Sequence, residues 1–170
     1  MGHKYFGYID VPTVMKGDQI MTDLSKGVLD VHGFKLTKTT KITDFENLPE
    51  GIVDIQKSKR GNTYIKFLVP IHSNGVDVIV HVSFYTDSEL PEIELYPDIR
   101  NMQKADNDWF GCRTLLRASQ KWLEGVLGES IEANGDVIII RTPFVRISSC
   151  ITYSHRDGCE RGGHIEIAFE

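Results

Sequence analysis

Five side chains with acid–base, hydrogen-bonding or aromatic character share one face of a predicted β-hairpin. Asn74-Gly75 is the dipeptide most typical of a two-residue hairpin turn, because both residues accept positive φ. The alternation of apolar and polar residues on either side of this turn then gathers on the outer face Tyr64, Lys66, His81, Ser83 and Tyr85. Such a face suits the binding of a ligand or a partner, and an ordinary solvated face is the alternative interpretation.

The turn also predicts which residues lie opposite one another. With Ser73 paired to Val76, eight apolar residues fall on the inner face without exception. On the outer face the same register predicts four pairs: Tyr64 with Tyr85, Lys66 with Ser83, Leu68 with His81, and His72 with Asp77. A three-residue turn at Arg60-Gly61-Asn62 predicts a further hairpin, with Val53 opposite Val69 and Ile55 opposite Phe67.

An enzymatic role would centre on His81, whose imidazole can act as general acid or base. Lys66, Ser83 and Tyr85 would assist it, as in a hydrolase or lyase. The step His81-Val82-Ser83 is similar to half of the paired motif of two-histidine phosphoesterases. No second copy follows, since His164-Ile165-Glu166 and His72-Ser73-Asn74 do not fit, so the sequence assigns no family.

A second group could bind a metal near the C-terminus. Its four members have the spacing C-x4-H-x3-C-x4-H, and they are Cys150, His155, Cys159 and His164. Thiolate and imidazole ligands suit zinc. The spacing lacks the tight pair found in most closed zinc sites, which favours a buried cysteine, a loop cysteine and two surface histidines instead. We therefore expect neither a metal nor another cofactor.

Acidic residues concentrate between Asp87 and Asp98 and include Glu89, Glu92 and Glu94. This segment is interpreted either as a solvated sheet edge or as a negative patch for a basic protein partner. The whole chain has a formal net charge of −5 and only scattered basic residues. A surface that binds nucleic acid needs clustered Lys and Arg, so we expect no nucleic-acid partner.

One long helix is predicted between about residues 106 and 128. Apolar residues recur there at helical spacing and form one wide stripe that includes Cys112, Trp122 and Leu123. Asp106 or Asn107 is expected to cap its first turn, and Gly128 to end it in a left-handed conformation. Most other segments alternate with period two, which predicts strands.

The resulting fold class is α+β: a mainly antiparallel sheet of about seven to nine strands, strongly curved, packed on the long helix. Before the hairpins, the sequence predicts a strand over residues 4–11, a short helix over 18–25 and an edge strand over 34–43. After the helix, a turn at Asn134-Gly135 is expected to pair Ile131 with Ile138 and to make 137–140 a central strand. A hairpin of residues 145–154 and 164–169 closes the chain, which we interpret as a single domain over residues 1–170.

Composition limits the cellular setting. The first residues lack the apolar run of a secretion signal, no apolar run is long enough to span a membrane, and three cysteines cannot all pair within the chain. We therefore expect a cytoplasmic protein without a membrane partner, with a homodimer through a sheet edge as one option.

The favoured function is binding of a protein or small molecule through the open sheet face or the acidic edge. The enzyme centred on His81 and the metal site are the alternatives.

Overall fold

The computed structural model describes residues 22–104, 111–154 and 159–170, apart from the side chains of residues 152–161. Eleven strands, one α-helix and two 3-10 helices (η) lie in these ranges: η1 (Leu24–Lys26), β1 (Leu29–Val31), β2 (Phe34–Leu36), η2 (Ile42–Asn47), β3 (Val53–Lys57), β4 (Thr63–Phe67), β5 (Ile71–Ser73), β6 (Val76–Phe84), β7 (Glu92–Pro97), α3 (Cys112–Leu127), β8 (Val137–Arg141), β9 (Val145–Ser154), β10 (Cys159–Gly162) and β11 (Ile165–Phe169). The strand predicted over 4–11 and most of the helix predicted over 18–25 lie outside the described residues.

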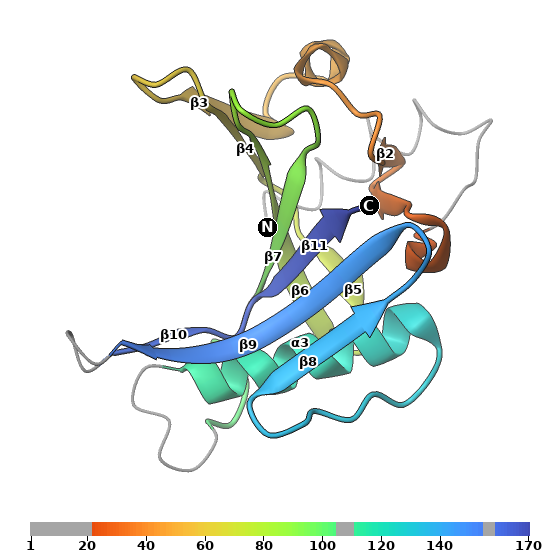
Figure 1. Cartoon of the computed structure of the whole chain (residues 1–170), viewed down its shortest axis with the longest axis vertical. Helices are drawn as coiled ribbons and strands as arrows, with labels where there is room; N and C mark the ends of the chain where they lie inside the picture. Colours follow the sequence, from red (N-terminus) through yellow and green to blue (C-terminus); the bar gives the residue numbers. More distant parts are fainter. Residues whose placement is uncertain (1–21, 105–110, 155–158) are drawn as a thin grey trace.

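Nine of these strands form one antiparallel sheet in the order β10-β9-β11-β7-β6-β4-β3, with β5 added to β6 and β8 added to β9. β1 and β2 form a separate two-stranded sheet. Figure 1 shows α3 crossing the lower part of the large sheet, while the segment from η1 to η2 runs along its right-hand side. The predicted α+β class and antiparallel sheet are confirmed, but the sheet is open rather than closed into a barrel.

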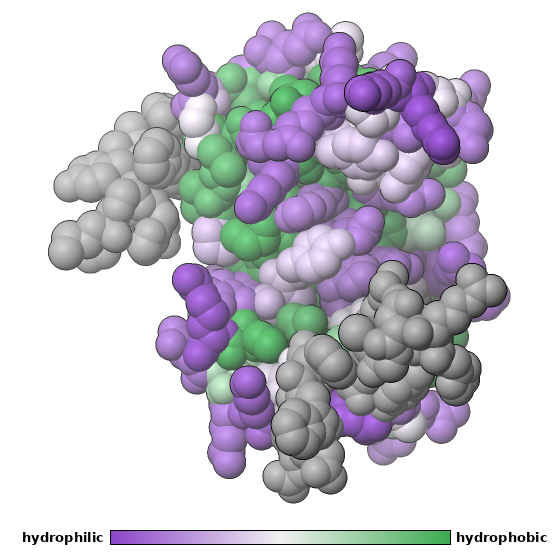
Figure 2. Space-filling model, turned by 90° about the vertical axis from the view of Figure 1, so that its left-hand side faces the viewer, coloured by the Kyte–Doolittle hydropathy of each residue, from purple (hydrophilic) through white to green (hydrophobic). Residues whose placement is uncertain are grey.

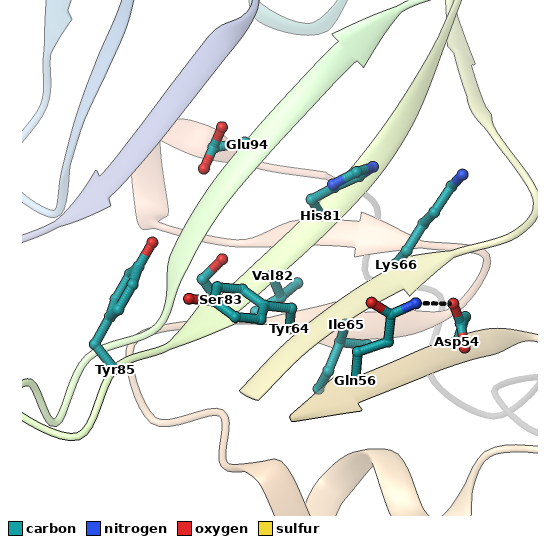
Figure 3. Close-up of a pocket in the computed structure, with 10 residues that line it drawn as sticks. All are labelled: Asp54, Gln56, Tyr64, Ile65, Lys66, His81, Val82, Ser83, Tyr85 and Glu94. Atoms are coloured by element: carbon teal, nitrogen blue, oxygen red, sulfur yellow. Dashed lines mark hydrogen bonds between the residues drawn. The ribbon is translucent and has the colours of Figure 1, made fainter. Parts of the chain in front are cut away.

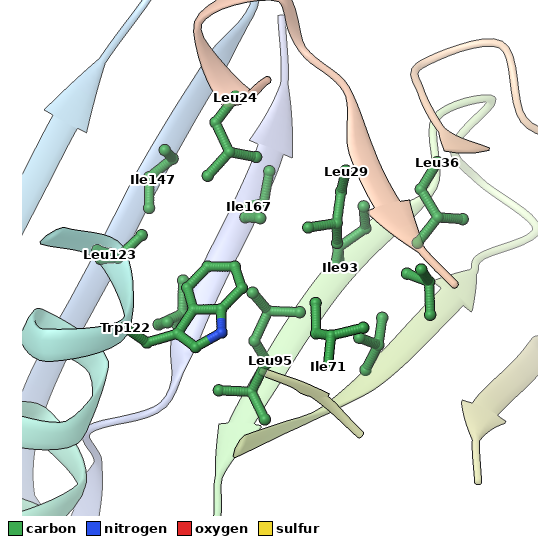
Figure 4. Close-up of a cluster of buried hydrophobic side chains, with 14 of the residues drawn as sticks. Leu24, Leu29, Leu36, Ile71, Ile93, Leu95, Trp122, Leu123, Ile147 and Ile167 are labelled. Carbon is green, nitrogen blue, oxygen red and sulfur yellow. The ribbon is translucent and has the colours of Figure 1, made fainter. Parts of the chain in front are cut away.

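Helix α3 buries its predicted apolar stripe against the sheet. Trp122 and Leu123 are almost fully buried among residues of β7 and β11, including Leu95 and Ile167 (Figure 4). The helix is shorter than predicted, because it begins at Cys112 and not near residue 106. Gly111 precedes it with a φ of 79°, a left-handed conformation that the helix cannot continue through. The predicted caps Asp106 and Asn107 lie outside the described residues, and the end at Gly128 is confirmed.

Two glycines let the helix approach its neighbours closely. A Cβ at Gly125 would overlap Ser73 Oγ and Asn74 Cβ, so only glycine lets the β5–β6 turn reach the last helical turn. There, Ser73 Oγ donates to the Trp122 carbonyl (3.1 Å) and Asn74 Nδ2 to that of Lys121 (2.9 Å). Gly163 has a φ of 92°, and a Cβ there would lie 2.5 Å from the Cys112 carbonyl oxygen. These contacts fix the helix on the inner face of the sheet.

A cluster of aromatic rings extends the core beyond the helix. Phe45 of η2 lies 4.8 Å from Phe34, 6.0 Å from Phe67 and 5.9 Å from Phe84 between ring centroids. The strand predicted over 34–43 is wrong in length, because β2 ends at Leu36. The chain then turns back at Thr37–Thr40 and enters η2, which places Phe45 over the sheet.

The predicted turn at Asn74-Gly75 is confirmed, with Ser73 opposite Val76 and Ile71 opposite Val78. Beyond it the predicted register is wrong by two residues, since Ile65 pairs with Val82 and not with Phe84. Between the pairs Lys66–His81 and Ile71–Val78 the segment 67–70 has four residues and β6 has two, so one-to-one pairing is lost there, next to Pro70, which has no N–H to donate.

Between β3 and β4 the register differs from the prediction by two residues as well. The strands are joined by the five residues 58–62 rather than by three, so Val53 lies opposite Phe67 and not Val69. Ser58 closes this loop, because its N–H donates to the Asn62 carbonyl and its Oγ accepts from the Asn62 N–H. Because side chains alternate with period two, both shifts keep every residue on its predicted face.

The C-terminal hairpin forms as predicted, with Ile147, Ile151, Ile165, Ile167 and Phe169 all buried. The prediction that residues 137–140 form a central strand is wrong, since among the described strands β8 pairs with β9 alone and lies at an edge. The pairing of Ile131 with Ile138 is also wrong. Asn134 bridges directly to Val137, and the Ile131 N–H bonds to the Glu124 carboxylate instead (3.2 Å).

Candidate functional site

One row of polar side chains crosses the face of the sheet turned away from α3, here called the open face. Asp54 of β3 lies opposite Lys66 of β4, and Lys66 lies opposite His81 of β6. His81 in turn lies opposite Glu94 of β7, and Glu94 opposite Glu166 of β11. Directly opposed residues share a face and have Cβ atoms about 4.5 to 5.5 Å apart, so five strands bring these groups into one line.

The corrected register changes which predicted site residues are neighbours. Lys66 lies opposite His81 rather than Ser83, and Tyr64 lies opposite Ser83 rather than Tyr85. The predicted pair of His72 and Asp77 is confirmed, with His72 Nδ1 2.7 Å from Asp77 Oδ1. Figure 3 shows Lys66 and His81 rising in the same direction from neighbouring strands. The amine and the imidazole therefore stand closer together than the sequence indicates.

A shallow concavity of about 240 Å³ lies over this part of the sheet. Its lining includes all five predicted outer-face residues, Tyr64, Lys66, His81, Ser83 and Tyr85, together with Asp54, Gln56 and Glu94 from the flanking strands (Figure 3). The rings of Tyr64 and Tyr85 meet edge to face, with centroids 6.2 Å apart. Ser83 lies at the base and is only 6% exposed.

The surroundings of His81 disfavour the protonated form of its imidazole. Burial lowers its pKa below the usual range, the positive charge of Lys66 and the nearby His164 lower it further, and the carboxylate of Glu94 opposes them. The His81 ring also packs against Tyr96, with centroids 4.7 Å apart. A neutral imidazole beside an amine can donate one hydrogen bond and accept another.

Sequence reasoning missed the group next to His81, which is formed by Glu94, Tyr96 and His164. Tyr96 stacks on His164 with ring centroids 4.8 Å apart, and its hydroxyl donates to Glu94 Oε2. Burial, followed by the hydrogen bond to Glu94, raises the pKa of the Tyr96 hydroxyl, so it remains a donor. Three aromatic rings thus form a continuous column from β6 to the start of β11.

His164 occupies a position between two carboxylates. Its Nε2 lies 3.2 Å from Glu94 Oε2 and 3.3 Å from Glu166 Oε1, in a geometry outside that of a hydrogen bond. Glu94 and Glu166 face each other directly across β7 and β11, an arrangement of like charges that destabilises a sheet. A proton on the imidazole would place a compensating positive charge between them.

The acidic segment does not form the predicted sheet edge. Glu92 and Glu94 belong to β7, which lies between β6 and β11 near the middle of the sheet. Glu94 is occupied by Tyr96 and His164, and Asp98 forms an ion pair with Arg100 at 2.6 Å. Glu94 and Asp98 thus have partners within the fold, and Glu94 contributes to the open face rather than to an edge.

The four proposed metal ligands are only partly described. Cys150 is a free, half-buried cysteine of β9, and His164 faces Glu94 and Tyr96. His155 lies outside the described residues, as does the side chain of Cys159. Among the residues that the structure describes, no group of three or more His, Cys, Asp or Glu is arranged to hold a metal ion. The proposed cysteine and histidine site stays a prediction.

Several large apolar side chains of the sheet and its turns are exposed: Ile55, Tyr64, Leu68, Leu90, Ile139 and Phe144. Figure 2 shows the left-hand side of Figure 1, where hydrophilic residues are interspersed with hydrophobic ones. Within the described ranges, no helix is long and apolar enough to cross a membrane.

Comparison with known proteins found no relative of this chain. No family model, no curated protein and no solved structure matches this chain.

Proposed function

We propose that the protein is a binding protein that holds a small organic molecule on the open face, in the concavity around Lys66 and His81. The observation that carries this proposal is the convergence of an amine, an imidazole, a hydroxyl and two tyrosine rings on one concave surface. Small-molecule sites commonly combine a few convergent polar groups with aromatic walls. The concavity is slightly smaller than the roughly 300 to 1,000 Å³ of ordinary ligand pockets, so the ligand would be small and partly exposed.

A thermal-shift screen against common metabolites tests the proposal. A ligand at about 100 times its Kd adds roughly 2.7 kcal/mol to the free energy of unfolding, which raises the Tm of a chain of this size by about 5 to 10 °C. Each compound that shifts the Tm is then repeated with Lys66→Ala and with Lys57→Ala. Lys57 is an exposed lysine of the adjacent strand β3 that lies opposite the buried Thr63, on the other face of the sheet.

We expect the shift to disappear in Lys66→Ala and to persist in Lys57→Ala. A shift that both variants retain would place the ligand elsewhere. If no compound in a broad panel shifts the Tm of the wild-type protein, the small-molecule proposal fails and a protein partner on the open face becomes the better explanation.

A second candidate is an acid–base enzyme of hydrolase or lyase type centred on His81. The specific observation in its favour is the lowered pKa of the imidazole, which leaves it free to accept a proton at neutral pH. Ser83, on the same strand and face, and Lys66 would assist it. Chromogenic esters and phosphate esters serve as probes, and we expect His81→Gln to lower any turnover by about 100-fold or more. Turnover that survives this substitution would exclude His81.

A further inference from the structure

Resting on the proposed ligand-binding role, we infer that the ligand is an aromatic or other planar molecule with an anionic group, a carboxylate or a phosphate. The anionic group would lie between Lys66 and His81, and the planar part would lie against Tyr64. The inference names the charge and shape of the ligand, which the proposed function leaves open.

The unused hydrogen-bonding groups in the concavity indicate the charge of the ligand. Its carboxylates are engaged: Asp54 Oδ2 accepts from Gln56 Nε2 at 3.1 Å, and Glu94 accepts from the Tyr96 hydroxyl. In the part of the chain that the structure describes, Lys66 Nζ and the ring nitrogens of His81 make no hydrogen bond or ion pair. The N–H groups of Lys66 and of the His81 ring are therefore donors without a partner among the described residues, and an anion would satisfy them.

Asp54 forms no ion pair with Lys66 in the described structure, although the two residues lie directly opposite each other. The Asp54 carboxylate turns instead to Gln56, two residues along the same strand (Figure 3). The positive charge of Lys66 acts on His81, whose pKa it lowers. An anion placed between the two would accept hydrogen bonds from the Lys66 amine and from the His81 ring.

The spacing of the residues sets the size of the ligand. Tyr64 and Lys66 are two residues apart on β4 and share the open face, so their side chains emerge about 7 Å apart. Tyr64 is 38% exposed, and its ring meets the edge of the Tyr85 ring. A planar group on Tyr64 and an anion at Lys66 are thus separated by about the length of a phenyl phosphate or a benzoate.

Two-dimensional ¹H–¹⁵N NMR of the full chain tests the inference with phenyl phosphate as the probe and benzylamine as its cationic counterpart. We expect phenyl phosphate to shift the amide signals of Tyr64, Lys66, His81 and Ser83, and inorganic phosphate to shift those of Lys66 and His81 more weakly. Lys66→Gln should weaken phenyl phosphate binding at least about tenfold, because a charge-assisted hydrogen bond is lost. Lys57→Gln, on the opposite face, should bind as the wild type does.

The outcomes separate this inference from the proposed function. If benzylamine shifts the same signals at lower concentration than phenyl phosphate, the anion is wrong but the open face still binds small molecules. If Lys66→Gln binds phenyl phosphate as tightly as Lys57→Gln, the subsite between Lys66 and His81 is wrong. If neither compound shifts these signals and the metabolite screen is also negative, both proposals fail together.

Discussion

Alternate residues of β4, β6 and β7 point to opposite faces of one sheet, and the two faces are built on different physical terms. On the inner face, Ile65, Val82 and Ile93 are almost fully buried in the hydrophobic core, which also contains Trp122 and Leu123 of α3. At the neighbouring position of each strand, Lys66, His81 and Glu94 form the polar row of the open face. Adjacent residues in the chain thus serve stability and surface chemistry separately.

The difference teaches where a function can reside in this fold. Residues of the inner face are determined by packing, since a change of even one methylene is felt in a close-packed core. On the open face, Lys66 Nζ and the nitrogens of His81 make no hydrogen bond or ion pair with the described residues. Their removal should therefore leave the fold intact, which makes the open face the place to look for binding.

Leu95→Ala and Glu92→Ala compare the two faces on a single strand. Leu95 is fully buried, so we expect Leu95→Ala to lower the free energy of unfolding by about 2 to 5 kcal/mol. Glu92 is exposed on the other face, and Glu92→Ala should change it by less than about 0.5 kcal/mol. Urea denaturation of the three proteins measures both values. Similar losses in the two variants would contradict the division of the sheet into a packed and an open face.

Gly163→Ala tests the close contact between the inner face and the helix. A left-handed backbone alone costs a residue with a Cβ about 1 to 2 kcal/mol, which Gly135→Ala would report, because no atom lies within 4 Å of a Cβ there. At Gly163 the Cβ also meets the Cys112 carbonyl oxygen and Leu115 Cβ, which adds about 1 to 3 kcal/mol of overpacking. Equal losses of stability in the two variants would show that α3 does not press on Gly163.

The sequence predicts which residues lie on the inner face, but it does not predict which of them are paired across the strands. The cause is the two-residue period of a β-strand. Apolar alternation marks the buried residues, and a register shift of two residues leaves that alternation unchanged. The shift arises at residues 67–70, where four residues stand against two of β6 and Pro70 lacks a donor. Local turn chemistry fixes the pairs next to Asn74-Gly75 and carries no information about this departure further along the strand.

The sequence predicts only those residues of the open face that lie close together in the chain. Tyr64, Lys66, His81 and Ser83 share a hairpin, so a pattern within about 20 residues could place them together. Glu94 and His164 are brought to the same place by the pairing of β7 with β11 across the chain. The alternation of Glu92, Glu94 and Tyr96 with apolar residues showed that they share a face, but not which strand lies beside them.

The pKa of His81 offers a sharper comparison within the open face. Because its folded pKa is lowered below the ordinary value of 6.5, the unfolded chain binds more protons just below that pH. The free energy of unfolding should therefore fall as the pH drops from about 6.5 towards the folded pKa, and His81→Gln should lack this loss. Urea denaturation between pH 8 and pH 5 measures the slope. A wild-type slope that is unchanged in His81→Gln would exclude His81 as its source.

Two neighbours of His81 should move its pKa in opposite directions. Lys66→Met removes a positive charge and should raise the pKa, whereas Glu94→Gln removes a negative one and should lower it. Lys57→Met, on the other face, should leave it unchanged. NMR titration of the imidazole Cε1–H signal follows each variant, and equal effects of Lys66→Met and Lys57→Met would show that the charge of Lys66 does not reach the ring.

Ile139→Thr gives the smallest expected effect and tests the apolar residue at the end of the polar row. The polar row continues from Glu166 to Ser148 and then to Ile139 on the edge strand β8, where the isoleucine is 57% exposed. If the face is solvated there, Ile139→Thr should change the free energy of unfolding by less than about 0.5 kcal/mol, and the wild-type Tm should not depend on protein concentration. A concentration-dependent Tm that Ile139→Thr abolishes would show instead that two copies of the chain meet at β8. The apolar end of the row would then belong to an interface, and its polar middle around Lys66 and His81 would remain the surface open to a ligand.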